Sequence, residues 1–424
     1  MIHREFLKRI IPGRFRPTIL TVLKVSDSLI GLPTQIRLRL LGRNRLRAFN
    51  IARRDKRVIF IAERPSWREA KLARGLKVLG WDVVLLCRKD PVFGDTGDFA
   101  EVQSFNSPAS AVALGYKSKA RLLHTFAPIC DDTCVQLVKD KPGRVIVDFY
   151  DDFFSITDGF PDMQRKYAVD IANQGFCLDR ADAICARDMQ LQYRRKATGV
   201  GRGRPILSFP EYCWDRQPLP GPRSDGEVRV AQIGYMGFEV RGEQDVGCFR
   251  VIREFVDAGC HFHIYMHPTF PPIGTQTFNY LFSQYLELSQ TTGRLHFHPT
   301  VPSNELVQEL TKYDFGFNMI NGPTFRDIEW TRMNPKRLPY CGSSRLFDYL
   351  DAGLGMVVDG ELSYMRRTFG PFGIILNGTE LVNARRIRGA LSNRPSRDVF
   401  LKARQKLSIE HNVHRLASFY ERLS

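Results

Sequence analysis

The chain has 424 residues, 43% of them hydrophobic and 25% charged. This is the composition of a folded globular protein, and it excludes disorder over the whole length. The length exceeds one ordinary hydrophobic core and suits two α/β domains. The formal net charge is +17, and residues 1–57 supply most of it, with 15 Lys and Arg against 3 Asp and Glu. So concentrated a positive charge predicts an anionic partner, either lipid headgroups or nucleic acid.

The sequence predicts no transmembrane helix, because no apolar run reaches about 18 residues. Thr18–Leu32 comes nearest, but Lys24 and Asp27 interrupt it, which also makes it a poor signal peptide. The nine cysteines are odd in number, and several lie inside apolar runs. This usage is typical of reduced, buried cysteines in a cytosolic protein. No second Cys or His pair accompanies Cys130 and Cys134, so no metal site is expected there.

Residues 1–56 form a basic arm in which apolar and basic residues alternate at roughly helical spacing, as in Ile36–Leu41. A basic amphipathic helix lies in the headgroup zone of a membrane with its apolar face down. Each Lys or Arg near an anionic leaflet contributes about 1 kcal/mol to such binding. Packing on the body of the protein and binding of nucleic acid are the two alternatives. Because the arm lacks interleaved aromatic positions for base stacking, we expect an anionic membrane surface and no nucleic acid.

From residue 57 to residue 209 the chain alternates short apolar runs with helical segments. The runs are expected to be buried parallel strands, since they are apolar almost throughout. They comprise residues 58–62, 83–87, 121–124, 145–150, 183–185 and 206–209. Helices are expected over residues 67–79, ended by Gly80, and over residues 163–180. Strands separated by helices predict a doubly wound parallel sheet, so residues 57–209 are interpreted as an N-terminal Rossmann-like domain.

Residues 210–226 are rich in Pro and Gly and are interpreted as a linker. A second alternating series fills residues 227–395. Its expected strands are residues 228–233, 261–266, 295–298, 315–319, 356–358 and 374–376. The final segment, 396–424, is expected to be helical throughout from Asp398 to Leu423 and to pack back towards the N-terminal domain. The predicted fold class is therefore α/β, with two Rossmann-like doubly wound parallel-sheet domains that face a central cleft, preceded by the basic arm.

Loops that follow strands are the candidate sites, because ligands of such sheets bind just beyond the carboxyl ends of the strands. The loop Gly234–Gly242 follows a predicted strand and precedes a helix. Gly234 and Gly237 would let the backbone approach a phosphate, and Arg241 could neutralise its charge. An ordinary glycine-rich turn is the alternative.

A second loop, Cys341–Leu354, has the more specific pattern. Ser343 or Ser344 is suited to the N-cap of a helix, whose free N–H groups attract an anion. Arg345 adds a guanidinium that can bind phosphate through two hydrogen bonds. Asp348, one turn later, could accept hydrogen bonds from both hydroxyls of a ribose, so together they suit a nucleoside diphosphate. The alternative is an ordinary surface ion pair between residues 345 and 348, worth roughly 0.2–0.5 kcal/mol.

The stretch Ser343–Val358 resembles the signature S-K-L-x-E-Y-L-A-A-G-x-P-V-V of the retaining glycosyltransferases of family four, which have the GT-B fold. In this resemblance Arg345 stands where the family has a diphosphate-binding Lys, and Asp348 where it has the acid that holds the ribose. Arg241-Gly242 is similar to the Lys-Gly of the family's glycine-rich loop. The resemblance covers roughly residues 57–410.

Two candidate catalytic residues in the first half follow from the same resemblance. His124 ends a predicted strand, where the family has a His that contacts the donor sugar near the reacting carbon; a buried structural His is the alternative. Asp151 belongs to an acidic cluster with Asp148 and Asp152, which could orient the acceptor or pair with arginines of the basic loop.

The resemblance implies transfer of a sugar, of the hexosyl type, from a nucleoside-diphosphate sugar to a hydroxyl of a glycan or lipid-linked acceptor. It also implies retention of anomeric configuration and no need of a metal or cofactor. Tyr235 and Tyr340 replace an Arg and a Glu of the family, so a non-catalytic nucleotide- or glycan-binding module on the same fold is the alternative. With the basic arm, we expect a cytoplasmic enzyme, peripheral on the inner face of the membrane, that makes cell-surface polysaccharide or glycolipid.

Overall fold

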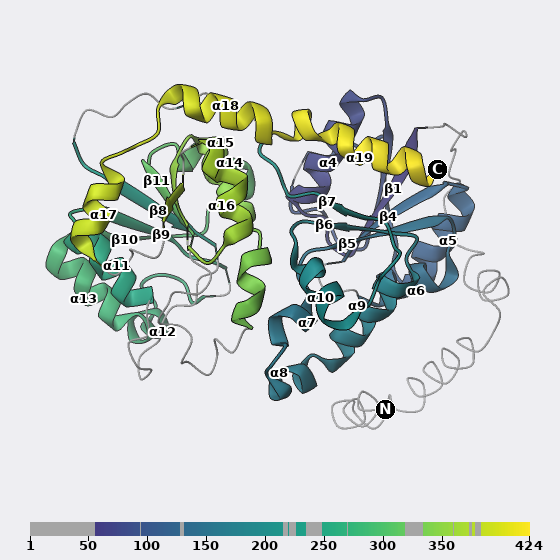
Figure 1. Cartoon of the computed structure of the whole chain (residues 1–424), viewed down its shortest axis with the longest axis horizontal. Helices are drawn as coiled ribbons and strands as arrows, with labels where there is room; N and C mark the ends of the chain where they lie inside the picture. The colour runs from purple at the N-terminus through teal and green to yellow at the C-terminus, as the bar shows by residue number, and fades with distance from the viewer. Residues whose placement is uncertain are drawn as a thin grey trace.

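The computed structural model describes most of the chain after the arm. Described are residues 56–93, 95–127, 131–214, 219, 226–234, 248–268, 270–318, 334–358, 360–372, 375–377 and 383–424. The predicted arm, apart from Lys56, lies outside these residues, as do Gly237, Arg241 and most of the predicted linker. Two parallel sheets stand side by side, each flanked by helices (Figure 1). The predicted α/β class with two doubly wound sheets is confirmed.

The N-terminal sheet has seven parallel strands in the order β3-β2-β1-β4-β5-β6-β7. These are β1 (Arg57–Ala62), β2 (Asp82–Cys87), β3 (Glu101–Ser104), β4 (Leu122–Ala127), β5 (Arg144–Phe149), β6 (Ala183–Ala186) and β7 (Ile206–Ser208). Alternate residues of β1 enter two separate cores, Phe60 on one face and Ile59 and Ile61 on the other. A sheet buried on both faces needs apolar side chains on both, which is why its inner strands are apolar runs.

Seven helices accompany this sheet. They are α4 (Trp67–Val78), α5 (Pro108–Ser118), α6 (Asp132–Asp140), α7 (Phe153–Thr157), α8 (Pro161–Lys166), α9 (Ala168–Arg180) and α10 (Gln190–Thr198). The single helix expected over residues 163–180 is wrong: α8 and α9 are separate, because Tyr167 leaves the helical conformation (φ −104°, ψ 21°). The ring of Tyr167 packs on Phe153 of α7, with ring centroids 4.8 Å apart. The break between α8 and α9 is therefore accompanied by a contact of Tyr167 with α7, which lies outside residues 163–180.

The C-terminal sheet has six parallel strands in the order β10-β9-β8-β11-β12-β13. These are β8 (Arg229–Ile233), β9 (His261–Tyr265), β10 (Leu295–His298), β11 (Phe315–Asn318), β12 (Gly355–Val358) and β13 (Ile375–Asn377). Its helices are α11 (Cys248–Asp257), α12 (Gln276–Leu281), α13 (Ser283–Thr292), α14 (Ser303–Leu310), α15 (Ser344–Ala352), α16 (Ser363–Phe369) and α17 (Ala384–Leu391). Two 3-10 helices, η4 (Pro335–Tyr340) and η5 (Gly370–Phe372), complete this half.

The C-terminal segment spans both halves of the molecule (Figure 1). Helix α18 (Arg397–Leu407) packs on α15, and α19 (Ile409–Leu423) packs on α4 of the N-terminal half. The expectation of one continuous helix is wrong, because Ser408 adopts an extended conformation and pairs with Cys213. The amide of Cys213 donates to the carbonyl of Leu407 (3.0 Å), and the amide of Ile409 donates to the carbonyl of Cys213 (2.8 Å).

Neither half shows a membrane-spanning element within the described residues, since no helix there is both long and apolar enough to cross a bilayer. The eight cysteines of the described part of the chain are buried free thiols. Cys130 lies outside it.

Candidate functional site

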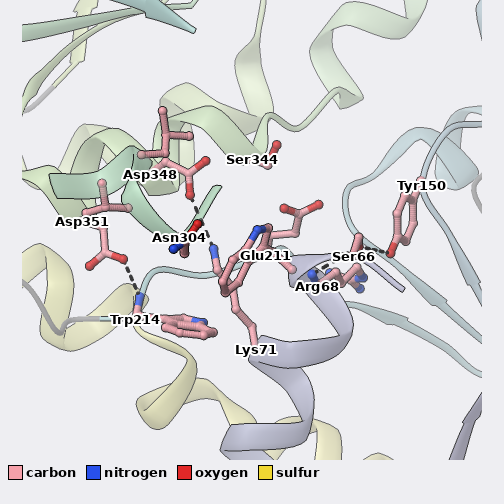
Figure 2. A pocket seen from close by; sticks show the side chains of 13 residues that line it. Ser66, Arg68, Lys71, Tyr150, Glu211, Trp214, Asn304, Ser344, Asp348 and Asp351 are labelled. Carbon is pink, nitrogen blue, oxygen red and sulfur yellow. Dashed lines mark hydrogen bonds and ion pairs between the residues drawn. The ribbon is translucent and has the colours of Figure 1, made fainter. Parts of the chain in front are cut away.

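A pocket of about 500 Å³ lies between the two sheets (Figure 2). Its size is within the range of small-molecule sites. Its wall is formed by Ser66, Trp67, Arg68, Lys71, Tyr150, Glu211, Trp214, Asn304, Leu306, Val307, Ser344, Asp348 and Asp351. On the N-terminal side these residues follow the carboxyl ends of β1, β5 and β7, which is where parallel sheets bind ligands.

The N-terminal wall is built on the first turns of α4. Ser66 caps this helix, and Glu69 completes a capping box by accepting from the Ser66 amide (2.9 Å). Arg68, only 1% exposed, donates from Nε and NH2 to the Asp148 carboxylate at 3.0 and 2.9 Å. Burial alone would raise the pKa of Asp148, but Arg68 lowers it below its ordinary value. The charge of Arg68 is thus balanced inside the protein, and Lys71, one turn later, points across the pocket.

The C-terminal wall is formed by residues of α14 and α15. Helix α15 begins at Ser344, so of the two N-cap candidates the structure has Ser343. Ser343 is the N-cap residue, yet its hydroxyl donates to Asn318 Oδ1 (3.0 Å) and makes no hydrogen bond to the helix. The first N–H groups of α15 are therefore not capped by this side chain, and they carry the partial positive charge of a helix N-terminus. Gly342, just before, donates its amide to Asp188 Oδ2 of the N-terminal half (3.0 Å).

Tyr349 holds α15 against its sheet. Its hydroxyl donates to the Phe317 carbonyl (2.9 Å) and accepts from the Ile233 amide (3.2 Å), so one side chain joins α15 to the ends of β8 and β11. The ring lies over Gly316, where an added Cβ would come 2.2 Å from it. Glycine at 316 thus leaves room for the ring, and the ring fixes the residues before and after it on α15.

Asp348 faces the N-terminal half across the pocket. Its Oδ1 lies 3.6 Å from Lys71 Nζ, with 24% of the Asp348 side chain exposed. Burial raises the pKa of Asp348 to about 6; Lys71 opposes this rise, whereas Glu211 and Asp351 add to it. Asp351 accepts a hydrogen bond from the Trp214 amide (3.1 Å). The structure therefore places Asp348 in an acidic pocket with a lysine beside it, rather than in bulk solvent.

Arg345 lies three residues before Asp348 on α15, and its side chain contacts the C-terminal sheet. An added Cβ at Gly234 would be 3.5 Å from Arg345 Nε, so the guanidinium packs against the end of β8. Gly234 adopts φ +75°, a conformation that favours glycine. Burial lowers the pKa of Arg345, and burial together with the charge of Arg345 lowers the pKa of His267. The structure thus joins three of the predicted positions, Gly234, Ser344 and Arg345, around the start of α15.

His124 lies away from the pocket surface. It is fully buried, with Nδ1 hydrogen-bonded to the Tyr420 hydroxyl and Nε2 at 3.2 Å from Asp148 Oδ2. Burial lowers its pKa, so the imidazole is neutral near pH 7. The atoms of His124, Asp148 and Cys185 that could ligate a metal ion lie within 4.8 Å of one another. Arg68, however, already donates hydrogen bonds to both Asp148 and Cys185. A second cation there would be repelled, so these residues do not suit a metal ion.

The three acidic residues of the predicted cluster point in different directions. Asp151 receives a hydrogen bond from Arg187 (2.9 Å), is 45% exposed and lies outside the pocket wall. Asp152 is buried, caps α7 and pairs with Arg194 at 2.8 Å. With Asp148 bound to Arg68, each carboxylate has an arginine partner. Arg187 follows β6 and Arg194 lies on α10, so these two partners do not belong to one basic loop, as the alternative interpretation supposed. A catalytic role for Asp151 stays a prediction.

Sequence reasoning missed several pocket residues, chiefly Lys71, Glu211 and Trp214. Glu211 and Trp214 come just after β7, so the rule that ligands bind beyond strand ends would have identified this loop. Its Pro content led to its interpretation as a linker. Lys71 has no local signal, because its partner lies in the other half of the chain.

No protein family and no curated protein matches the sequence. Solved structures do resemble the fold. Sucrose-phosphate synthase from Thermosynechococcus elongatus has a TM-score of 0.59 at 11% identity, over 87% of this chain and 99% of that one. The lipopolysaccharide outer core galactosyltransferase WaaB has a TM-score of 0.53 at 12% identity, over 86% of this chain and 99% of that one. AviGT4, a glycosyltransferase involved in avilamycin A biosynthesis, has a TM-score of 0.52 at 13% identity, over 86% of this chain and 97% of that one. The chain therefore has the two-domain GT-B fold that the sequence predicted.

Proposed function

We propose that the protein is a glycosyltransferase that moves a sugar from a nucleoside-diphosphate sugar to a hydroxyl of a glycan or lipid-linked acceptor. One observation carries this proposal: Ser344 and Asp348, at the start of α15, line a pocket between the two sheets of a GT-B fold. The family-four subgroup and retention of configuration belong to the proposal and rest on the resemblance of Ser343–Val358.

The donor would lie on the C-terminal half. Its diphosphate would bind at the uncapped start of α15 and at Arg345, which packs beside Gly234. Its ribose would donate hydrogen bonds to the Asp348 carboxylate. Negative charge grows on the diphosphate as the glycosidic bond breaks, so a fixed guanidinium and helix N–H groups stabilise the transition state more than the ground state. With this positive charge supplied by the chain, the proposed reaction needs no metal.

The acceptor would lie against the N-terminal wall. Trp67 and Tyr150 present ring surfaces there, and the Tyr150 hydroxyl lies 3.2 Å from Ser66 Oγ. Burial raises the pKa of Tyr150 well above its ordinary value, so this hydroxyl stays protonated. It donates to the Glu69 carboxylate at 3.3 Å, and its oxygen can accept a hydrogen bond from a sugar hydroxyl. A wall of rings and neutral hydroxyls suits a sugar, whose surface is likewise partly apolar and partly hydroxyl.

A thermal-shift screen with nucleoside diphosphates and their sugars tests donor binding, because a ligand of the native state raises the melting temperature. We expect one base to stabilise the wild type and Asp348→Asn to lose this stabilisation. Asp162→Asn is the matched control, since Asp162 lies on exposed α8 in a pair with Arg165. Equal stabilisation of wild type and Asp348→Asn by every nucleotide would refute the proposed donor site.

A non-catalytic nucleotide- or glycan-binding module is the second candidate. Tyr340 motivates it: at this position, where the resembled family has a Glu, the ring packs on Tyr193 of α10, with centroids 5.8 Å apart. A packed ring offers no carboxylate to a sugar. Donor-hydrolysis and transfer assays over a panel of acceptors distinguish the candidates, since nucleotide binding without any turnover would favour the module.

The proposed location is the cytoplasmic face of a membrane, held through the basic residues 1–56. The proposal rests on their charge and amphipathic spacing. Flotation with liposomes that contain or lack anionic lipid tests it, and we expect binding to the anionic liposomes only. Absence of binding to either would refute it, and salt-sensitive binding to nucleic acid would favour the other anionic partner.

A further inference from the structure

We propose that Lys71, from the N-terminal half, is a positioning residue for donor binding: it is the counter-ion that keeps the Asp348 carboxylate charged and able to accept hydrogen bonds from the ribose. This inference rests on the proposed function, in which Asp348 binds the donor. It adds a residue outside the Ser343–Val358 motif. It also makes donor binding depend on how the two halves of the molecule are placed.

The geometry of the pair is the first support. Lys71 lies on the second turn of α4, and its side chain, 10% exposed, extends across the pocket to Asp348 on α15 (Figure 2). The Nζ–Oδ1 distance of 3.6 Å makes this an ion pair between the two halves. Because both side chains line the pocket, the pair stands where the proposed donor would bind.

The charges around Asp348 are the second support. Glu211, from the segment after β7, and Asp351, on α15 itself, both disfavour its ionised form. Arg345, also on α15, packs beside Gly234, and burial lowers its pKa by more than Asp348 raises it. The pocket residues of α14, Asn304, Leu306 and Val307, carry no charge. Glu211 has a second cation near it, because Arg187 lies 3.9 Å away. Lys71 is therefore the cation paired with Asp348 itself in the described wall of the pocket.

Lys71 is itself suited to this role. Burial alone would lower the pKa of Lys71, but Asp348, Glu211 and Asp351 raise it above its ordinary value, so the ammonium stays charged. Arg68, the other cation of the wall, is bound to Asp148. Without Lys71, Asp348 would take up a proton at higher pH, and a carboxylic acid is a poorer acceptor for a diol than a carboxylate.

The test is the pH dependence of nucleotide affinity. The probe is UDP, GDP or ADP, whichever stabilises the wild type most, with the dissociation constant measured by calorimetry between about pH 5.5 and 8.5. We expect wild-type affinity to fall as the pH drops below about 6, where Asp348 becomes protonated. In Lys71→Met the fall should begin at higher pH, so the difference in affinity from the wild type should be smallest near pH 8.5 and grow as the pH drops.

The size of the effect follows from the charge removed. An opposite charge within about 4–6 Å shifts a carboxyl pKa by roughly 1–3 units, so Lys71→Met should weaken binding about tenfold at pH 6.5. Lys71→Arg should restore the wild-type profile, and adding Glu211→Gln to Lys71→Met should move the profile part of the way back. Lys77→Met is the matched control, because Lys77 lies on the same helix outside the pocket wall and pairs with Asp98.

The outcomes separate the inference from the proposed function. If Asp348→Asn binds the nucleotide as tightly as the wild type, the proposed function fails and the inference with it. If Asp348→Asn loses binding but Lys71→Met keeps the wild-type pH profile, the inference alone is overturned. Tighter binding by Lys71→Met at every pH would also overturn it, because Lys71 would then compete with the ligand for Asp348.

Discussion

Replacing Asp348 with Asn should make the protein more stable while it abolishes nucleotide binding. Burial raises the pKa of Asp348 from 3.8 to about 6, so keeping this group ionised in the folded protein costs free energy. At 1.36 kcal/mol per pKa unit, the full cost near pH 7 is about 3 kcal/mol. Asn has nearly the same shape and no charge, so the variant avoids this cost.

The ion pair with Lys71 limits how much Asp348→Asn can raise the free energy of unfolding. Removing the carboxylate takes away a partner at 3.6 Å, although Glu211 and Asp351 still hold the lysine in its charged form. The pKa of about 6 already includes the attraction of Lys71, so about 3 kcal/mol is the upper limit. We expect Asp348→Asn to stabilise the protein by about 1–3 kcal/mol near pH 7. In a domain of this size each kcal/mol raises the melting temperature by about 2–4 °C.

The sign of the pH dependence gives a second measurement. The folded-state pKa of Asp348 is the higher one, so the stability that its protonation provides is complete below about pH 3.8 and is lost as the pH rises through about 6. The advantage of the variant should therefore be largest near pH 7.5 and fall to about a third of that value near pH 4.5. Urea unfolding at both pH values, with and without the stabilising nucleotide, measures each quantity. Lower stability of Asp348→Asn at pH 7.5, or an advantage independent of pH, would refute the reasoning.

Three further substitutions test how the pocket walls are held, each by urea unfolding. Gly316→Ala should destabilise by about 1–3 kcal/mol or more, because its Cβ would overlap the Tyr349 ring at 2.2 Å; unchanged stability would contradict that packing. Tyr349→Phe should cost about 1–3 kcal/mol by leaving a buried amide unpaired, and nucleotide affinity should fall with it, since α15 is then less firmly placed. Arg68→Met should cost about 3–5 kcal/mol by leaving the Asp148 charge buried without its partner, and adding Asp148→Asn should recover part of this loss. No recovery in the double variant would show that packing of Arg68, rather than its charge, is what matters.

The sequence predicted both sheets because buried parallel strands are apolar on both faces and stand out from their surroundings. β3 was missed for the complementary reason: Glu101–Ser104 is an edge strand whose residues alternate between exposed and half-buried, so it has no apolar run. The break at Ser408 was missed because its cause is not local. It forms where the chain pairs with Cys213, about 195 residues earlier, which no periodicity within the segment reveals.

The same distinction applies to the site. Ser344, Arg345 and Asp348 lie within one turn of a single helix, so their spacing was visible in the sequence. The sequence did not show that the Arg345 and Asp348 side chains contact different neighbours. Arg345 packs beside Gly234, and Asp348 faces Lys71 of the other half of the molecule. For His124 the sequence allowed two interpretations. His124 is buried because it lies in the inner strand β4, and its partner Tyr420 on α19 comes 296 residues later in the chain.

Helix α4 links these observations, because successive turns of it serve different halves of the molecule. Its first turn holds Arg68, whose charge is matched by Asp148 next to His124 and Tyr420, so this turn is fixed inside the N-terminal half. Its second turn holds Lys71, whose closest carboxylate is on α15. A rigid anchor one turn away limits where Lys71 can reach, so any movement of the C-terminal half relative to α4 changes the distance to Asp348. Ionisation of Asp348, the proposed hydrogen-bond acceptor for the ribose, therefore depends on the distance between the two halves. A nucleotide-sugar donor that requires the carboxylate would favour the arrangement in which Lys71 and Asp348 are in contact.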